Sequence, residues 1–212
     1  MKKLVVLVSF VVLVLAAGPA QAAGPPYTVS VGGSSAAGTH PFSAATTGTV
    51  RFSSKNNAGT ILNQNCTSVN MTGSVTTGTA VSQVGDVGSS AWIGCSIPGG
   101  AFTATQVGTW RWVGTGTNAT SGQETVQGRI DGLVVNWRTA ANPNVCRYTM
   151  SGSARASFNE STQQLTISET GYTGNLTLSN VFGCLGQWQN GNTVNLEMTF
   201  NVSSPDGAIN LS

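Results

Sequence analysis

The chain has 212 residues, of which only 8% are charged, and it contains 27 glycines and four cysteines. Nine residues are Lys or Arg and seven are Asp or Glu, but Lys2 and Lys3 belong to an amino-terminal leader, so the remaining chain carries seven charges of each sign. Its six arginines are scattered, and a clustered basic face is what binding to nucleic acid requires. Composition therefore argues against a nucleic-acid partner.

The first 22 residues have the pattern of a secretory signal peptide. Lys2 and Lys3 precede the apolar run LVVLVSFVVLVLAA, and Ala20-Gln21-Ala22 supplies a small-x-small cleavage site. The run is about 14 residues long, whereas a membrane-spanning helix needs roughly 20. We expect a secreted, extracellular or cell-envelope-associated protein with no membrane span after cleavage, whose residues 23–212 form a single β domain.

Period-2 alternation predicts strands through the rest of the chain. Candidate strands lie near residues 27–32, 47–54, 67–76, 101–113 and 126–138. In the last of these, the inward set shifts from Ile130 to Leu133, and Gly132 at the change predicts a β-bulge. Residues 165–180 place Leu165, Ile167, Leu176 and Leu178 inward around the sequence ETGYTGN, which predicts a hairpin.

The clearest strand covers residues 193–202. Val194, Leu196, Met198, Phe200 and Val202 share one face, and polar residues that include Glu197 share the other. One apolar face and one polar face are typical of an antiparallel sheet with one side in water.

The chain repeats its own pattern after about 80 residues. Gly48 and Cys66 are 18 residues apart, as are Gly128 and Cys146, and each of these cysteines precedes a Met-(Ser/Thr)-Gly-Ser phrase. We interpret this as an internal duplication with halves near 44–117 and 124–203, although Met71 and Met150 differ by one residue in register. A bulge or a chance match explains that difference. The fold class expected is all-β, a single antiparallel sandwich or barrel of about 8–10 strands.

The four cysteines have the spacing of disulfides. An exported chain forms disulfides, no C-x-x-C pair occurs, and His40, the only histidine, is remote from all four. We therefore expect neither a metal site nor a cofactor. The duplication selects one of three pairings: Cys66 with Cys95, and Cys146 with Cys184.

At this level the chain resembles a family of small secreted actinobacterial proteins of unknown function with four cysteines. The matching pieces are TTGTVRF, QVGTWRW, CRYTMSGSA, NESTQQLTI and LSNVFGCLG followed by NGNTV, in order over most of the chain. The resemblance implies export, a β-rich fold and two disulfides, and it supplies no activity and no site residues.

Motifs of catalysis are missing from the sequence. It contains no G-x-S-x-G, H-E-x-x-H or S-x-x-K. His40 has no acidic neighbour in the sequence that would orient it as a general base, so we expect a solvated loop histidine. The carboxylates are expected on the surface, with Glu197 on the outward face of its strand. We expect a protein that is not an enzyme.

Tryptophans are the candidate ligand-binding residues. Trp110 and Trp112 share one face of a strand, and they form either part of the core or, if exposed, a platform for a sugar. Trp188 lies in the polar stretch GCLGQWQNGN and is expected to be the most exposed of the three.

The sequence thus predicts a non-enzymatic binding or structural protein of the cell exterior. Its partner would be an envelope polysaccharide or another extracellular protein. The alternatives are a small-molecule carrier with a hollow barrel, an envelope pore, and a secreted carbohydrate-active hydrolase.

Overall fold

The alternation in the sequence appears as an all-β structure. A computed structural model describes residues 27–97, 100–116 and 125–212, so the leader and Glu124 lie outside the described residues. The described chain forms fifteen strands and one short 3-10 helix. Their bounds are β1 (Tyr27–Val31), β2 (Gly38–Thr46), β3 (Val50–Lys55), β4 (Ile61–Cys66), β5 (Ser68–Val81), β6 (Gln83–Ile93), β7 (Cys95–Ile97), β8 (Gly100–Gln106), β9 (Trp110–Gly114), β10 (Thr125–Thr139), β11 (Cys146–Asn159), β12 (Gln164–Glu169), β13 (Leu176–Gly183), η1 (Cys184–Gly186), β14 (Thr193–Ser203) and β15 (Ile209–Leu211).

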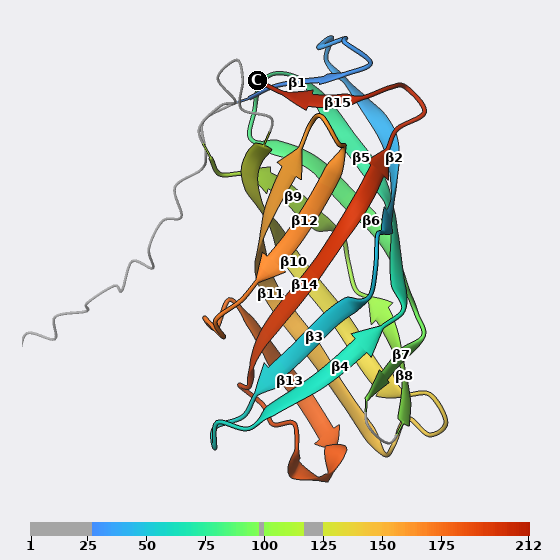
Figure 1. Cartoon of the computed structure of the whole chain (residues 1–212), viewed down its shortest axis with the longest axis vertical. Helices are drawn as coiled ribbons and strands as arrows, with labels where there is room; N and C mark the ends of the chain where they lie inside the picture. Colours follow the sequence, from blue (N-terminus) through green and yellow to red (C-terminus); the bar gives the residue numbers. More distant parts are fainter. Residues whose placement is uncertain (1–26, 98–99, 117–124) are drawn as a thin grey trace, which may run out of the picture.

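Thirteen of these strands build a barrel of eight long strands. Five of the eight are interrupted and consist of two segments that follow one another end to end: β2/β3, β4/β5, β6/β7, β8/β9 and β12/β13. The other three, β10, β11 and β14, are continuous. Each long strand pairs antiparallel with the one before it, and β14 returns to pair with both β2 and β3. The predicted all-β class is confirmed, and the sheet closes as an up-and-down barrel (Figure 1).

The hairpin predicted over residues 165–180 is wrong. β12 and β13 do not pair with each other; both run antiparallel to β11 and to β14 in the same gap. Ile167 lies opposite Ala156, and Leu176 lies opposite Gly152, so residues 170–175 form an excursion from one long strand. The inward positions were predicted correctly, because Leu165, Ile167, Leu176 and Leu178 are all at most 1% exposed.

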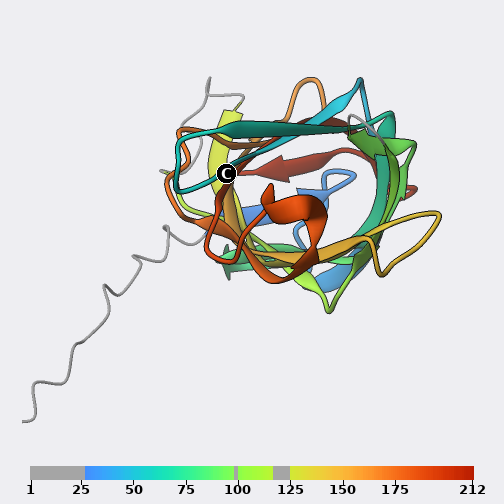
Figure 2. The same ribbon diagram turned by 90° about the horizontal axis from the view of Figure 1, so that it is seen from below.

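Both ends of the barrel are covered. β1 and β15 pair with each other across the upper end (Figure 1). The lower end is covered by the segment 184–192, which contains η1 and which lies across the opening in the view from below (Figure 2). Trp188 in this segment packs on Tyr148 and Phe102, with ring centroids 5.4 and 6.1 Å away.

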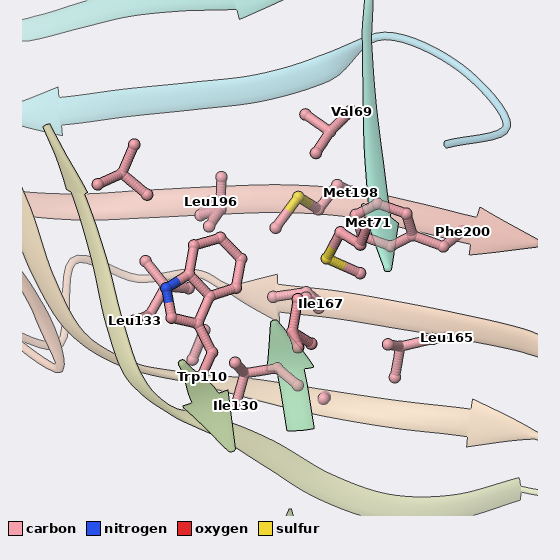
Figure 3. Packing of buried hydrophobic residues seen from close by; sticks show 14 of the residues in the cluster. Val69, Met71, Trp110, Ile130, Leu133, Leu165, Ile167, Leu196, Met198 and Phe200 are labelled. Carbon is pink, nitrogen blue, oxygen red and sulfur yellow. The ribbon is translucent and has the colours of Figure 1, made fainter. Parts of the chain in front are cut away.

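Large side chains fill the interior. Alternate residues of each strand point inward, and those of β5, β9, β10, β12 and β14 meet in one apolar cluster (Figure 3). Trp110, Phe158 and Phe200 are at most 1% exposed in the upper part, and Trp137 and Tyr148 are 1% and 2% exposed in the lower part. Burial of one such side chain stabilises the fold by about 1.5–3 kcal/mol.

Glycines allow the register to change inside the barrel. The predicted bulge at Gly132 is confirmed: the pairing of β10 with β11 shifts between Ile130 and Leu133, and Gly132 has a φ of 68°. Opposite it, Gly152 has a φ of 142°, and a Cβ there would lie 1.9 Å from the Asn175 carbonyl oxygen. The two glycines keep alternate residues inward on both sides of the bulge.

The two disulfides are those that the duplication selected. Cys66–Cys95 joins β4/β5 to β6/β7, and Cys146–Cys184 joins β11 to the lower end of β12/β13. Each half of the chain contributes four consecutive long strands, and each disulfide connects the second and third strand of its half. Two disulfides indicate that the chain folds in an oxidising environment.

Candidate functional site

A groove of about 580 Å³ lies on the outer wall of the lower barrel. Its floor is the paired backbone of β10 and β11, and β8 and β13 form its sides. Inward-facing Trp137 and Tyr148 belong to the floor, and the outward side chains are polar. These polar residues, which we call the groove residues, are Thr105, Asn136, Arg138, Arg147, Thr149 and Asn180.

A tight hairpin places the two arginines face to face. β10 and β11 are joined by residues 140–145, and the register pairs Trp137 with Tyr148 and Arg138 with Arg147. The turn is closed by a hydrogen bond from the Val145 backbone N–H to the Asn142 carbonyl, at 3.1 Å. Because Trp137 and Tyr148 point inward, their neighbours Arg138 and Arg147 both point outward.

Each guanidinium is held by a neighbour on the adjoining strand. The Arg147 guanidinium lies over the ring of Phe182, 4.5 Å from the centroid. Arg138 donates from Nε to the hydroxyl of Thr103, at 3.3 Å. Both side chains are therefore restricted before any ligand arrives, which lowers the entropy lost on binding.

Amide and hydroxyl groups line the middle of the groove. The Thr149 hydroxyl donates to Asn136 Oδ1 at 2.8 Å, and Asn180 Nδ2 lies 3.4 Å from the Thr149 oxygen. Asn180 has a φ of 52° at the point where the pairing of β13 with β11 changes register. This left-handed backbone is uncommon outside glycine, although asparagine adopts it most readily.

Carboxylates are placed elsewhere in the described chain. The ion pairs within 4.0 Å there are His40–Asp206, Arg129–Asp131 and Arg155–Glu169. Neither Arg138 nor Arg147 takes part in them. The groove is consequently a positive, hydrogen-bonding surface on a barrel of nearly balanced charge.

The predicted tryptophans are not on the surface. Trp110 and Trp112 are 0% and 2% exposed, which confirms the core interpretation over the platform. The expectation that Trp188 is exposed is wrong, because the residue is 3% exposed and its ring turns inward onto Tyr148. Its indole lines only a recess of about 250 Å³ beside Ile61 and Ile97 at the lower rim.

His40 has an acidic neighbour that the sequence did not reveal. The residue lies in β2, and its Nδ1 is 2.8 Å from Oδ2 of Asp206, which is 166 residues away. The expectation of a solvated loop histidine without an acidic partner is therefore wrong. Both side chains are partly exposed, at 25% and 46%. Ser43 and Ser203, the nearest paired hydroxyls along β2 and β14, bond to each other at 3.0 Å.

One carboxylate that was expected on the surface is buried. Glu169 is 0% exposed and accepts hydrogen bonds from the Arg155 backbone N–H at 3.2 Å and from Asn175 Nδ2 at 3.0 Å, and also from the Thr173 hydroxyl. It organises the excursion at residues 170–175. Glu197 lies on the outward, exposed face of β14, as predicted.

The lower interior contains polar groups enclosed by aromatic rings. Burial raises the pKa of the Tyr148 phenol well above its usual range, and the hydroxyl donates to Oε1 of Gln64. The indole N–H of Trp188 and the side-chain amide of Asn192 have no hydrogen-bond partner among the described residues. No group of three or more His, Cys, Asp or Glu that could hold a metal ion occurs in the described part of the chain.

The groove residues were missed in the sequence, but a signal for them was present. In NWRTAANPNVCRY, Trp137 and Arg138 precede a turn, and Arg147 and Tyr148 follow it in mirror order. A hairpin centred on this turn necessarily sets Arg138 opposite Arg147.

Comparisons with known proteins add no assignment. No family model, curated protein or solved structure matches the chain. Within residues 27–97, 100–116 and 125–212, no helix is both long and apolar enough to cross a membrane.

Proposed function

We propose that this is an exported, non-enzymatic binding protein whose outer-wall groove takes a hydroxyl-rich polymer of the cell envelope. The observation that carries the proposal is the groove itself: about 580 Å³ on a rigid wall, lined by guanidinium, amide and hydroxyl groups. Such groups form hydrogen bonds with sugar hydroxyls. The leader and the two disulfides support export to an oxidising environment.

The interior of the barrel is filled with side chains, which favours binding on the outer wall over a carrier function. A carrier needs a cavity of several hundred Å³ inside the barrel, and here Trp110, Trp137, Tyr148, Phe158 and Phe200 occupy the interior. The segment 184–192 and the β1–β15 pair cover the two ends.

The outward side chains also argue against a pore. A barrel in a lipid bilayer presents apolar residues outward. In β14 the outward positions are Thr193, Asn195, Glu197, Thr199 and Asn201, while the inward positions are apolar. This is the reverse of the pattern that lipid requires.

A hydrolase is supported less well than a binding protein. Glycoside hydrolysis needs two carboxyl groups that face one sugar. The groove contains guanidinium, amide and hydroxyl side chains, and Glu169 is buried and accepts three hydrogen bonds.

The test blocks the groove with a bulky neutral side chain, which leaves the charge of the groove unchanged. Asn136 points outward from the centre of the groove, so Asn136→Trp should block it. The matched control is Ala91→Trp, an exposed outward position on β6 outside the groove. Sedimentation with purified cell walls should retain the native protein and Ala91→Trp and should lose Asn136→Trp.

Two results would reject the proposal. One is equal sedimentation of all three proteins, or of none of them, with cell walls. The other is steady release of reducing sugar from the walls by the native protein, abolished by replacing a single Asp or Glu, because that would establish a hydrolase.

A further inference from the structure

We propose that the groove is an oxyanion site, in which one carboxylate or phosphate of an acidic polymer bridges the Arg138 and Arg147 guanidinium groups. This inference rests on the proposed binding function and names the chemical class of its ligand. It is carried by the placement of the two arginines relative to each other and to every carboxylate of the described chain.

Direct opposition of two like charges is unfavourable in the free protein. Arg138 and Arg147 are register partners in an antiparallel pair, where opposite Cβ atoms lie about 4.5–5.5 Å apart. Like charges in that position destabilise a sheet. A bound anion converts the repulsion into two attractions, so the arrangement is stable with a ligand and costly without one.

The other cations of the described chain have a carboxylate or an aromatic ring beside them. Arg51 lies opposite Glu197, and Arg111 lies opposite both Asp86 and Asp131. Arg129 pairs with Asp131 at 2.6 Å, Arg155 approaches Glu169 at 4.0 Å, and Lys55 lies over the Tyr172 ring at 5.8 Å. Arg129 and Arg155 are also register partners, but each of them has a carboxylate within 4.0 Å. Among the described residues, Arg138 and Arg147 are the only opposed cations that have no carboxylate within 4.0 Å.

The groove supplies the geometry for a shared anion. Phe182 supports Arg147 and Thr103 holds Arg138, so both planar groups are oriented before binding. Guanidinium groups donate in a fixed fork that matches carboxylate and phosphate oxygens. Asn136, Thr149 and Asn180 beside them can bond the hydroxyl groups next to the anion.

The ligand class is a polymer that carries both oxyanions and hydroxyl groups. The oxyanion has two possible sources, a sugar carboxylate and a phosphodiester, and both present oxygens to the same fork. Free inorganic phosphate shares the charge but lacks the hydroxyl groups, so it should bind more weakly than an oligomer.

Isothermal titration of the full mature chain tests the site with four probes. These are a galacturonate oligomer, a glycerol phosphate oligomer, a neutral glucose oligomer and inorganic phosphate. Arg138→Gln, Arg147→Gln and the double variant remove the cations, and Arg111→Gln is the control, because it removes an exposed arginine from the outer wall at a site with carboxylate partners. Melting curves confirm that each variant is folded.

We expect at least one anionic oligomer to bind, and whichever one binds identifies the source of the oxyanion. Each single variant should weaken it about tenfold to a hundredfold, which corresponds to one charged hydrogen bond. Arg111→Gln should bind as the native protein does, and the affinity should fall as salt is added.

Three results would overturn the inference. These are anionic oligomers that bind the double variant as tightly as the native protein, a neutral oligomer that binds as tightly as the anionic ones, and failure of every probe to bind. If the double variant still sediments with cell walls while Asn136→Trp does not, the binding function stands and the oxyanion assignment fails.

Discussion

The two halves of the barrel share one plan and differ in how they place their charges. Each half supplies four long strands and one disulfide between its second and third strand. In the first half, Arg111 lies opposite carboxylates, whereas in the second half Arg138 lies opposite Arg147 and neither has a carboxylate within 4.0 Å. The features that the two halves share, their strands and disulfides, are those that build the barrel. The feature in which they differ, the opposed arginines, lies on the surface that we assign to binding.

This comparison predicts that the halves contribute equally to stability and unequally to recognition. The disulfide and arginine variants remove matched features from the two halves, and the variants at Trp188 and Glu160 test the second half alone. They are ordered from the largest expected effect to the smallest.

Removal of either disulfide should have the largest effect. The bonds connect residues 29 and 38 positions apart, and the chain-entropy model then assigns each about 3.6–3.9 kcal/mol. Urea unfolding of Cys66→Ala/Cys95→Ala and of Cys146→Ala/Cys184→Ala should show losses that agree within about 1 kcal/mol. An unchanged midpoint for one variant, with a large fall for the other, would contradict the equal structural roles.

Removal of the Trp188 ring from the segment that covers the lower end should have the next largest effect. Trp188 is 3% exposed and packs on Tyr148, whereas Leu185, three residues earlier, is 91% exposed. Trp188→Ala should lower the free energy of unfolding by about 3 kcal/mol, and Leu185→Ala by less than about 0.5 kcal/mol. Equal effects of the two changes would show that the ring does not pack inside the barrel in solution.

The turn of the second half at residues 160–163 should make stability depend on pH. Burial raises the pKa of the Glu160 carboxyl, and the hydrogen bond from the Leu211 backbone N–H lowers it in part. A raised pKa means that the fold favours the protonated acid, so this contribution to stability is complete below the ordinary glutamate pKa. It is lost as the pH rises through the folded pKa.

Glu160→Gln isolates that dependence, because the amide oxygen can still accept from Leu211. Urea unfolding between about pH 4 and pH 7 covers the range just above the ordinary glutamate value. The stability of the native protein relative to Glu160→Gln should fall as the pH rises. A difference that stays constant, or one that rises, would contradict the sign.

Replacing one arginine in each half should change the free energy of unfolding least, and in opposite directions for the two halves. Arg138→Gln removes a like-charge opposition and should raise the free energy of unfolding by a few tenths of a kcal/mol, and Arg111→Gln removes an opposite-charge one and should lower it by a similar amount. Thermal melts at low salt measure both. The same sign for the two variants would remove the argument that the arginine pair is held at a cost.

The sequence predicted the features that depend on alternation and spacing. It gave the inward residues of β12, β13 and β14, the bulge at Gly132 and the pairing of the cysteines, because each follows from period 2 or from the repeat. The hairpin predicted around the turn after Glu169 was wrong, because glycines at a turn are as consistent with an excursion from one strand as with a hairpin between two.

Other features depend on contacts between distant parts of the chain. A polar neighbourhood in the sequence suggested that Trp188 is exposed, but the ring meets Tyr148, 40 positions earlier. Asp206 reaches His40 only because β2 pairs with β14 when the barrel closes. The opposed arginines were accessible from the sequence, because both flank one short hairpin turn.

Observation of the arginine side chains during ligand binding tests the oxyanion site most directly. The chain has six arginines, so a 15N-labelled sample should give six Nε–H resonances. As the anionic oligomer that binds is added, the resonances of Arg138 and Arg147 should shift together along one saturating curve. Those of the other four, Arg51, Arg111, Arg129 and Arg155, should stay in place. Uniform small shifts of all six, or a saturating shift confined to an arginine outside the groove, would contradict the account.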